Sequence, residues 1–155
     1  MLSPSGVDAD QTKKLNINDF NPKLIDNFKK EHRILIAMFK RIHSNATNHN
    51  TEDVRADLKK FRLLLTGHLL KENQHLYSYL YKTLSDETSV DMVKDMKKEM
   101  DGIGSVVLSF IAKYSKHDSS IDEVFMKDLG EIGEALVSRI QNEEQHLYPN
   151  YLPEN

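Results

Sequence analysis

The sequence predicts an all-α protein that folds as an antiparallel up-down-up-down four-helix bundle. Apolar side chains recur at three- and four-residue spacing along four long stretches, which is the pattern of amphipathic helices. Short polar turns separate these stretches, and none of them shows the alternation typical of a strand. Because helices joined by short turns lie antiparallel, each helix should neighbour the next.

The first two predicted helices span residues 22–44 and 52–82. The Asn21-Pro22 pair begins the first helix, since asparagine caps free amide groups and proline at the first helical position loses no hydrogen bond. A polar turn follows, and Asn50 or Thr51 can cap the second helix.

The third and fourth predicted helices span residues 90–116 and 121–148. The fourth ends at Pro149, because proline cannot continue the helical hydrogen-bond pattern. These helices place the bundle in residues 20–155. Residues 1–19 are polar and show no helical period, so we expect a flexible N-terminal arm there.

The composition excludes several classes of protein. The 155 residues carry 21 basic and 24 acidic side chains, a net charge of -3, so we expect no nucleic-acid partner. Cysteine is absent, which leaves histidine and carboxylates as ligands for a metal such as iron, manganese or zinc. The sequence has no apolar run long enough to cross a membrane and no apolar signal-peptide core near its start. We therefore expect a cytoplasmic protein with no membrane partner.

Ionisable side chains fall on the inward faces of the predicted helices. A charge in a bundle core costs several kcal/mol unless it is compensated. A single buried histidine is more often a hydrogen-bonded core residue than a metal ligand. The pair His68 and Glu72 is more specific, because a four-residue spacing puts both side chains within reach of one ion. The inward ionisable candidates are His32, His68, Glu72, His75, Arg139, Glu143 and His146, and the third helix offers only Met100 at this level.

A short motif occurs twice, once in the second helix and once in the fourth. Its copies are Glu72-x-x-His75-Leu76-Tyr77 and Glu143-x-x-His146-Leu147-Tyr148. Four residues before the glutamate, the first copy has His68 and the second has Arg139. The two halves of the predicted site therefore differ in one ligand position.

Three segments of the chain form a recognisable set: Glu31-His32 with Ile36 and Phe39, Gly67-His68-x-x-x-Glu72-x-x-x-Leu76-Tyr77, and Arg139-Ile140-x-x-Glu143-Glu144-x-x-Leu147-Tyr148-Pro149. They resemble the hemerythrin-like (HHE cation-binding) family, and the similarity runs from about Phe20 to Leu152. The resemblance implies a four-helix bundle holding non-haem di-iron. Its ligands would be one histidine each from helices 1 and 3, and a His-x-x-x-Glu or His-x-x-x-Asp pair each from helices 2 and 4. Members of the family bind dioxygen, sense oxygen, redox state or iron, or handle iron and NO.

Carried over to this chain, the resemblance makes His32, His68, Glu72 and Glu143 the metal ligands. Met100 and Arg139 stand where the family has histidines, so the di-iron site is degenerate. Arg139 brings a permanent cation beside Glu143, where it can replace the charge of a metal. The expected cofactor is one or two non-haem irons, or no metal at all.

Two other interpretations stay open. The Glu-x-x-His pairs also resemble ferritin-like di-iron carboxylate bundles, which makes His75 and His146 weaker candidate ligands. That family needs a further glutamate on each of the other helices, and Glu31 and Glu99 both lie about a quarter turn off the inward face. Three segments are similar to the metal-free regulator-of-sigma-D anti-sigma factors: Lys23-Leu24-Ile25-Asp26-x-Phe28, Gly67-His68, and Ile132-Gly133-Glu134-Ala135-Leu136-x-x-Arg139-x-x-x-Glu143-Glu144.

The leading hypothesis is a non-enzymatic hemerythrin-like domain that binds a metal ion, with dioxygen as a possible second ligand, and that senses oxygen, redox state or iron. No activated nucleophile is evident in the sequence. The alternative is a metal-free bundle that binds a regulatory protein partner, with Arg139 in place of the metal.

Overall fold

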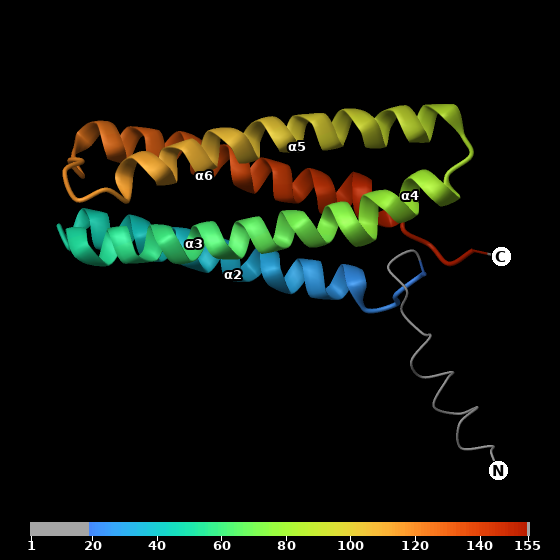
Figure 1. The fold of residues 1–155 in the computed structure, drawn as a ribbon, viewed down its shortest axis with the longest axis horizontal. Coiled ribbons are helices and arrows are strands. Elements are labelled where there is room, and N and C mark those ends of the chain that lie inside the picture. Colours follow the sequence, from blue (N-terminus) through green and yellow to red (C-terminus); the bar gives the residue numbers. More distant parts are fainter. Residues whose placement is uncertain (1–18, 155) are drawn as a thin grey trace, which may run out of the picture.

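The computed structural model describes residues 19–154, and it confirms the predicted antiparallel up-down-up-down bundle. In Figure 1, α2, α3, α5 and α6 lie side by side and alternate in direction along the chain. Apart from Asp19, the predicted N-terminal arm (1–19) lies outside the described residues. The elements are α2 (Leu24–Thr47), α3 (Thr51–Lys71), η1 (Glu72–Tyr77), α4 (Ser78–Thr83), α5 (Glu87–Tyr114), α6 (Glu123–Asn142), η2 (Glu143–Leu147) and η3 (Tyr148–Asn150).

Two helices begin at residues set by aspartate caps. Helix α5 begins at Glu87, three residues earlier than predicted, because the Asp86 carboxylate accepts a hydrogen bond from the Ser89 amide at 2.8 Å. The Asp122 carboxylate caps α6 in the same way and accepts from the Phe125 amide at 3.2 Å. Each of these two helices therefore has its start fixed by its own aspartate side chain.

The duplicated motif forms a π-helical segment in both copies, where the sequence predicted continuous α-helix. Segments η1 and η2 both begin at the motif glutamate. A π turn holds one more residue than an α turn, so two adjacent side chains can face the core. Leu76 and Tyr77 are both buried, and so are Leu147 and Tyr148.

The core consists of two apolar clusters that are separated along the bundle axis. One cluster lies toward the α2–α3 turn and includes Leu35, Leu65 and Leu136. The other lies toward the chain ends and includes Phe28 and Leu147. The gap between them falls at the same level on α2, α3 and α6. All of the buried charged residues and histidines that the structure describes, except Asp57, occupy it: His32, His68, Glu72, Arg139 and Glu143.

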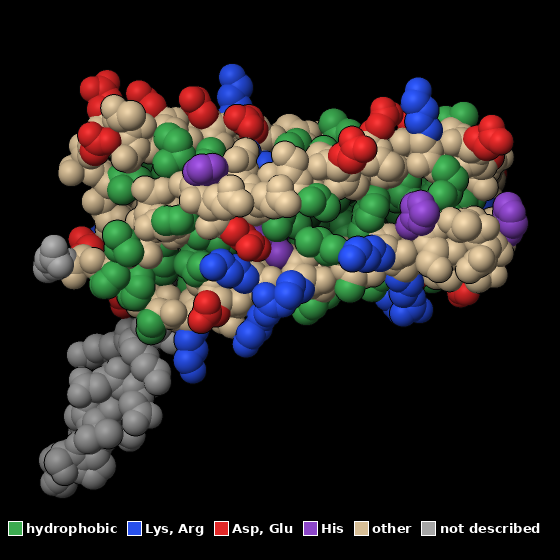
Figure 2. All heavy atoms as spheres, turned by 180° about the vertical axis from the view of Figure 1, so that it is seen from behind, with side chains coloured by type: hydrophobic (Ala, Val, Ile, Leu, Met, Phe, Trp, Pro, Cys, Tyr) green, Lys and Arg blue, Asp and Glu red, His purple; other side chains and the backbone are tan. Residues whose placement is uncertain are grey.

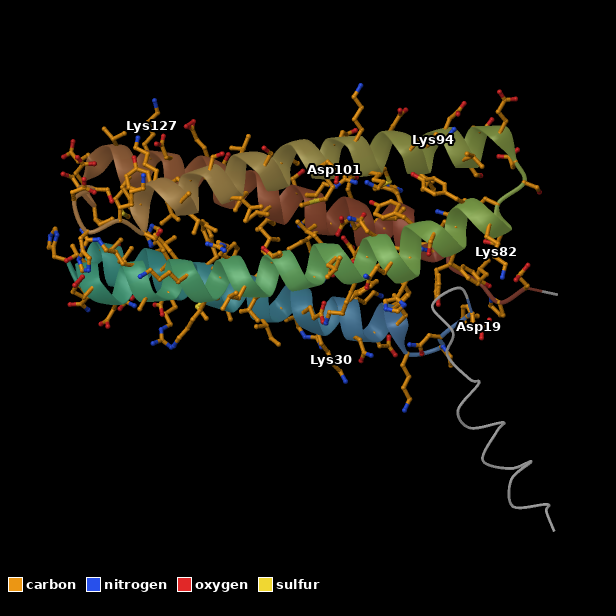
Figure 3. The ribbon with its side chains drawn as sticks, in the orientation of Figure 1. Asp19, Lys30, Lys82, Lys94, Asp101 and Lys127 are labelled. Carbon is orange, nitrogen blue, oxygen red and sulfur yellow. The ribbon has the colours of Figure 1, made fainter. Side chains whose placement is uncertain are left out.

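Charged side chains project from the outside of the bundle (Figure 2). In Figure 3 the labelled Lys30, Lys94 and Lys127 point away from the helices into solvent. Of the helices that the structure describes, none combines the length and apolar character needed to cross a membrane.

Replacing Phe125 with alanine tests the larger apolar cluster. Phe125 is fully buried, and its ring lies 5.3 Å from Phe110 and 4.9 Å from Tyr114, centroid to centroid. We expect Phe125→Ala to lower the free energy of unfolding by about 3–5 kcal/mol, because it leaves a cavity. The neighbouring Val124 is 57% exposed, and Val124→Ala should change it by about 0.5 kcal/mol at most. Urea unfolding followed by circular dichroism measures both, and equal effects would contradict the assigned core.

Candidate metal centre

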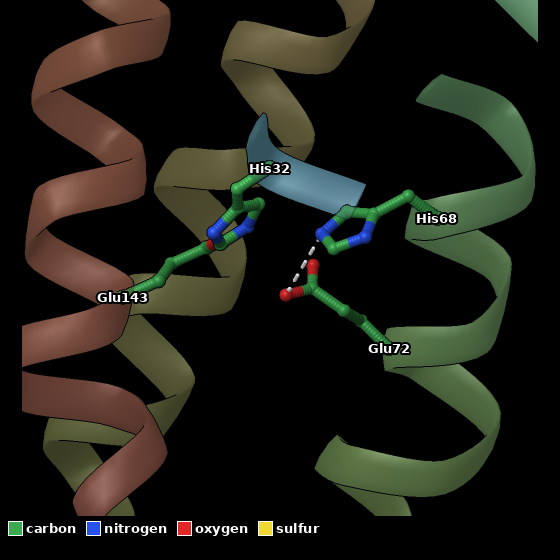
Figure 4. A group of neighbouring side chains, drawn as sticks. All are labelled: His32, His68, Glu72 and Glu143. Atoms are coloured by element: carbon green, nitrogen blue, oxygen red, sulfur yellow. Dashed lines mark ion pairs between the residues drawn. The ribbon is translucent and has the colours of Figure 1, made fainter. Parts of the chain in front are cut away.

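Four predicted ligands meet between the two apolar clusters. They come from α2, from the continuous helix formed by α3 and η1, and from η2. His32 comes from α2, His68 from α3, Glu72 from the start of η1 and Glu143 from the start of η2. One donor atom from each lies within 4.8 Å of the others, and all four side chains are buried. Figure 4 shows the two imidazoles and the two carboxylates turned toward a common centre.

Each histidine of this cluster faces one glutamate through its Nε2 atom. His32 Nε2 lies 3.2 Å from Glu143 Oε1, and His68 Nε2 lies 3.3 Å from Glu72 Oε2. The first pair joins α2 to η2, whereas the second lies within one continuous helix. The cluster therefore ties the two halves of the bundle together.

Two further carboxylates contact the Nδ1 atoms of the histidines, on the side of each ring away from the cluster. Glu144 Oε2 lies 2.6 Å from His32 Nδ1, and Glu31 Oε1 lies 2.7 Å from His68 Nδ1. Lys71 pairs with the other oxygen of Glu31. Carboxylates in this position orient a ligand imidazole and make its other nitrogen more basic. Sequence reasoning missed this role for both glutamates, although each is adjacent in sequence to a predicted ligand.

Arg139 lies beside the cluster, and its hydrogen bonds go to α5. Its Nη1 atom is 3.2 Å from Glu99 Oε2, and its Nη2 atom donates to the Met96 carbonyl at 3.1 Å. Its contact with the cluster is an ion pair of 3.9 Å from Nε to Glu143 Oε2. The predicted cation is thus present at one carboxylate, with its guanidinium turned away from the centre of the four ligands.

The other candidates lie outside the four-residue cluster. His75 is half-buried and His146 is exposed. Glu31 and Glu99 bind His68 and Arg139, respectively, as outer partners. Met100 is buried, and its side chain lines the cavity beside the cluster.

A cavity of about 550 Å³ adjoins the cluster and passes between α2 and α6. Figure 2 shows this face of the molecule, with apolar side chains gathered between the two helices. Its walls include Leu35, Phe39, Leu65, Met100 and Leu136, and its inner end reaches all four residues of the cluster. A small apolar molecule therefore has a route from the surface to the ligands.

The donor set fits a single metal ion. Within the described part of the chain, His68 Nε2, Glu72 Oε1 and Glu143 Oε2 are buried without a hydrogen-bond partner. An unsatisfied buried polar group costs about 1–3 kcal/mol, and more when it is charged. Two imidazoles and two carboxylates suit iron, manganese or zinc, and such an ion would bond to His68 Nε2 and offset the charge of both carboxylates.

Protons compensate part of the charge when no metal is bound. Burial raises the pKa of Glu143, and the nearby Glu72 carboxylate raises it further, against the opposing effect of His32 and His68. Burial lowers the pKa of His68, but the negative charges of Glu72 and Glu143 and the hydrogen bond between Nδ1 and Glu31 outweigh it and raise the pKa to about 9. The metal-free cluster therefore holds a proton on His68 at neutral pH.

The bundle and its buried His/Glu cluster define the class of protein as a helical bundle with a candidate cation site. The model of the Hemerythrin HHE cation binding domain matches residues 23–151. The chain therefore belongs to the hemerythrin HHE cation-binding family. No curated protein and no solved structure gave a significant match.

The stability of the metal-free protein should fall as pH rises from about 6.5 to 9. The pKa of His68 is higher in the folded protein than the ordinary 6.5, so its protonation stabilises the fold below pH 6.5 and is lost toward pH 9. The loss should be on the order of 3 kcal/mol at most. Urea unfolding in the presence of a chelator measures it, and His68→Gln should flatten the dependence. A stability that rises over this range would contradict the assigned protonation.

Proposed function

We propose that this domain binds one non-haem iron ion through His32, His68, Glu72 and Glu143 and acts, without catalysis, in sensing or binding oxygen. The observation that carries this proposal is the buried four-residue cluster with unsatisfied donor atoms at its centre. Membership of the cation-binding family supports the same conclusion. We also propose a cytoplasmic location, as expected from the sequence.

One ion is proposed because the second half of the family's site is chemically altered. Met100 stands in the helix 3 ligand position, and a thioether is a soft ligand that selects ions such as Cu(I), whereas the imidazole it replaces suits iron. Arg139 stands in the helix 4 position and cannot lose its charge. Its bonds to Glu99 and Met96 hold this cation 3.9 Å from Glu143, where it would repel a second metal.

The apolar cavity supports a role with dioxygen. Four protein ligands leave positions free on a six-coordinate iron, and the cavity reaches the cluster from the α2–α6 face. Apolar walls exclude water and charged competitors but admit a small apolar gas.

Iron titration under anaerobic conditions tests the metal site. We expect about one ferrous ion per chain, and visible bands that appear only when oxygen is admitted. His32→Ala and Glu143→Gln should each weaken iron binding by at least about tenfold, because each removes a donor from a four-ligand set. His146→Ala is the matched control, since His146 is exposed and outside the cluster, and its iron content should equal that of the wild type.

Two results would overturn this proposal. Two ions per chain would show that Met100 and Arg139 do not block the second position. Iron far below one per chain, with no response to oxygen, would remove the metal function.

The second candidate function is a metal-free module that binds a regulatory protein partner, as the anti-sigma resemblance suggests. The contact of Arg139 with Glu143 and the two direct His–Glu pairs favour it, because they compensate buried charge without an ion. Under this function, iron and chelators should both leave the midpoint of thermal unfolding unchanged. A midpoint that rises with iron concentration would exclude it, because a ligand that binds the folded state stabilises that state.

A further inference from the structure

The hydroxyl group of Tyr148 lies among the four candidate ligands. It donates a hydrogen bond of 2.7 Å to Glu72 Oε2 and lies 3.1 Å from His32 Nε2. Its ring is buried and stacks on the His32 ring at 5.6 Å between centroids. The residue begins η3, directly after the π segment that carries Glu143. The C-terminal segment therefore places a phenol oxygen next to Glu72 and His32.

The spacing of the donor atoms matches neighbouring positions around one ion. Glu143 Oε1 is 3.2 Å from His32 Nε2, which is 3.1 Å from the Tyr148 oxygen. That oxygen is 2.7 Å from Glu72 Oε2, which in turn is 3.3 Å from His68 Nε2. Bonds of about 2.0–2.2 Å to a metal place adjacent donors about 3 Å apart. Five donor atoms are thus connected by four such contacts.

The first copy of the motif contains a matched tyrosine that lacks these contacts. Tyr77 follows Glu72 at the same spacing as Tyr148 follows Glu143, and it is equally buried. Within the described residues, its hydroxyl group has no hydrogen-bond partner. The position on α5 that corresponds to His32 is Met100, which offers no imidazole. The two tyrosines therefore differ in their contacts with the cluster.

We propose that Tyr148 is a fifth protein ligand, which binds ferric iron as a phenolate. This inference rests on the proposed iron site. Glu72 and Glu143 balance the two charges of ferrous iron, and a phenolate would supply the third negative charge that ferric iron needs in a buried site. On oxidation by ferricyanide, one electron passes from the iron to the oxidant. The phenol O–H bond breaks, the oxygen–iron bond forms, and the proton leaves to solvent.

Visible spectroscopy tests this ligand without any assay of activity. The full-length protein is loaded with ferrous iron without oxygen and then oxidised with one equivalent of ferricyanide. We expect an intense visible phenolate-to-iron band, and resonance Raman bands of the tyrosine ring when that band is excited. Tyr148→Phe should keep its iron and lose the band. Tyr77→Phe removes an equally buried hydroxyl group and should leave the band unchanged.

A second measurement does not depend on how the variants fold. Wild-type protein grown with ring-deuterated tyrosine should show shifted resonance Raman bands. If the ferric protein holds about one iron but has no phenolate band, or if the band persists in Tyr148→Phe, the Tyr148 ligand is refuted and the iron site stands. If the wild type takes up no iron, the proposed function fails, and the Tyr148 proposal fails with it.

Discussion

Two carboxylates buried at the centre of the bundle are the constraint on which this structure depends. Glu72 and Glu143 belong to the same buried cluster, and ionising a carboxylate there costs free energy because the charge is removed from water. Another buried carboxylate, Asp57, is satisfied by hydrogen bonds from Arg41 and Asn45 of the neighbouring helix. The two central glutamates instead keep one oxygen each without a hydrogen-bond partner in the described structure, and the surrounding histidines, protons and arginine compensate their charge only in part.

The surroundings of the two glutamates repeat in an approximate way. His68 pairs with the carboxylate of Glu31 on the side away from the cluster, and Arg139 pairs with the carboxylate of Glu99. An outer carboxylate therefore contacts the arginine in the same way as one contacts the histidine. Both halves also carry a π segment that begins at the glutamate. One half keeps its imidazole ligands, while the other is fixed as an ion pair. This asymmetry supports the proposal that the site holds one ion.

Packing around the cavity keeps the cluster accessible. Gly133 of α6 has no side chain, and a Cβ atom there would lie 2.5 Å from the ring of Phe39. This close approach lets the Phe39 ring pack against α6 as part of the cavity wall. The apolar clusters on both sides of the polar layer hold the helices in register, so the donor atoms meet without direct support from loops.

The sequence by itself predicted the four long helices and the inward candidates, because the period of a helix fixes which side chains share a face, and the family resemblance selected four of these candidates as ligands. His68 and Glu72 had to point the same way, and the apolar residues around them had to point inward. The direction of the Arg139 side chain was decided by its α5 partners, Glu99 and the Met96 carbonyl, which lie far away in sequence. The position of Tyr148 depended on the π segment before it. Only the tertiary structure could show these features, since contacts between helices select one rotamer and one helical register among several that the local sequence allows.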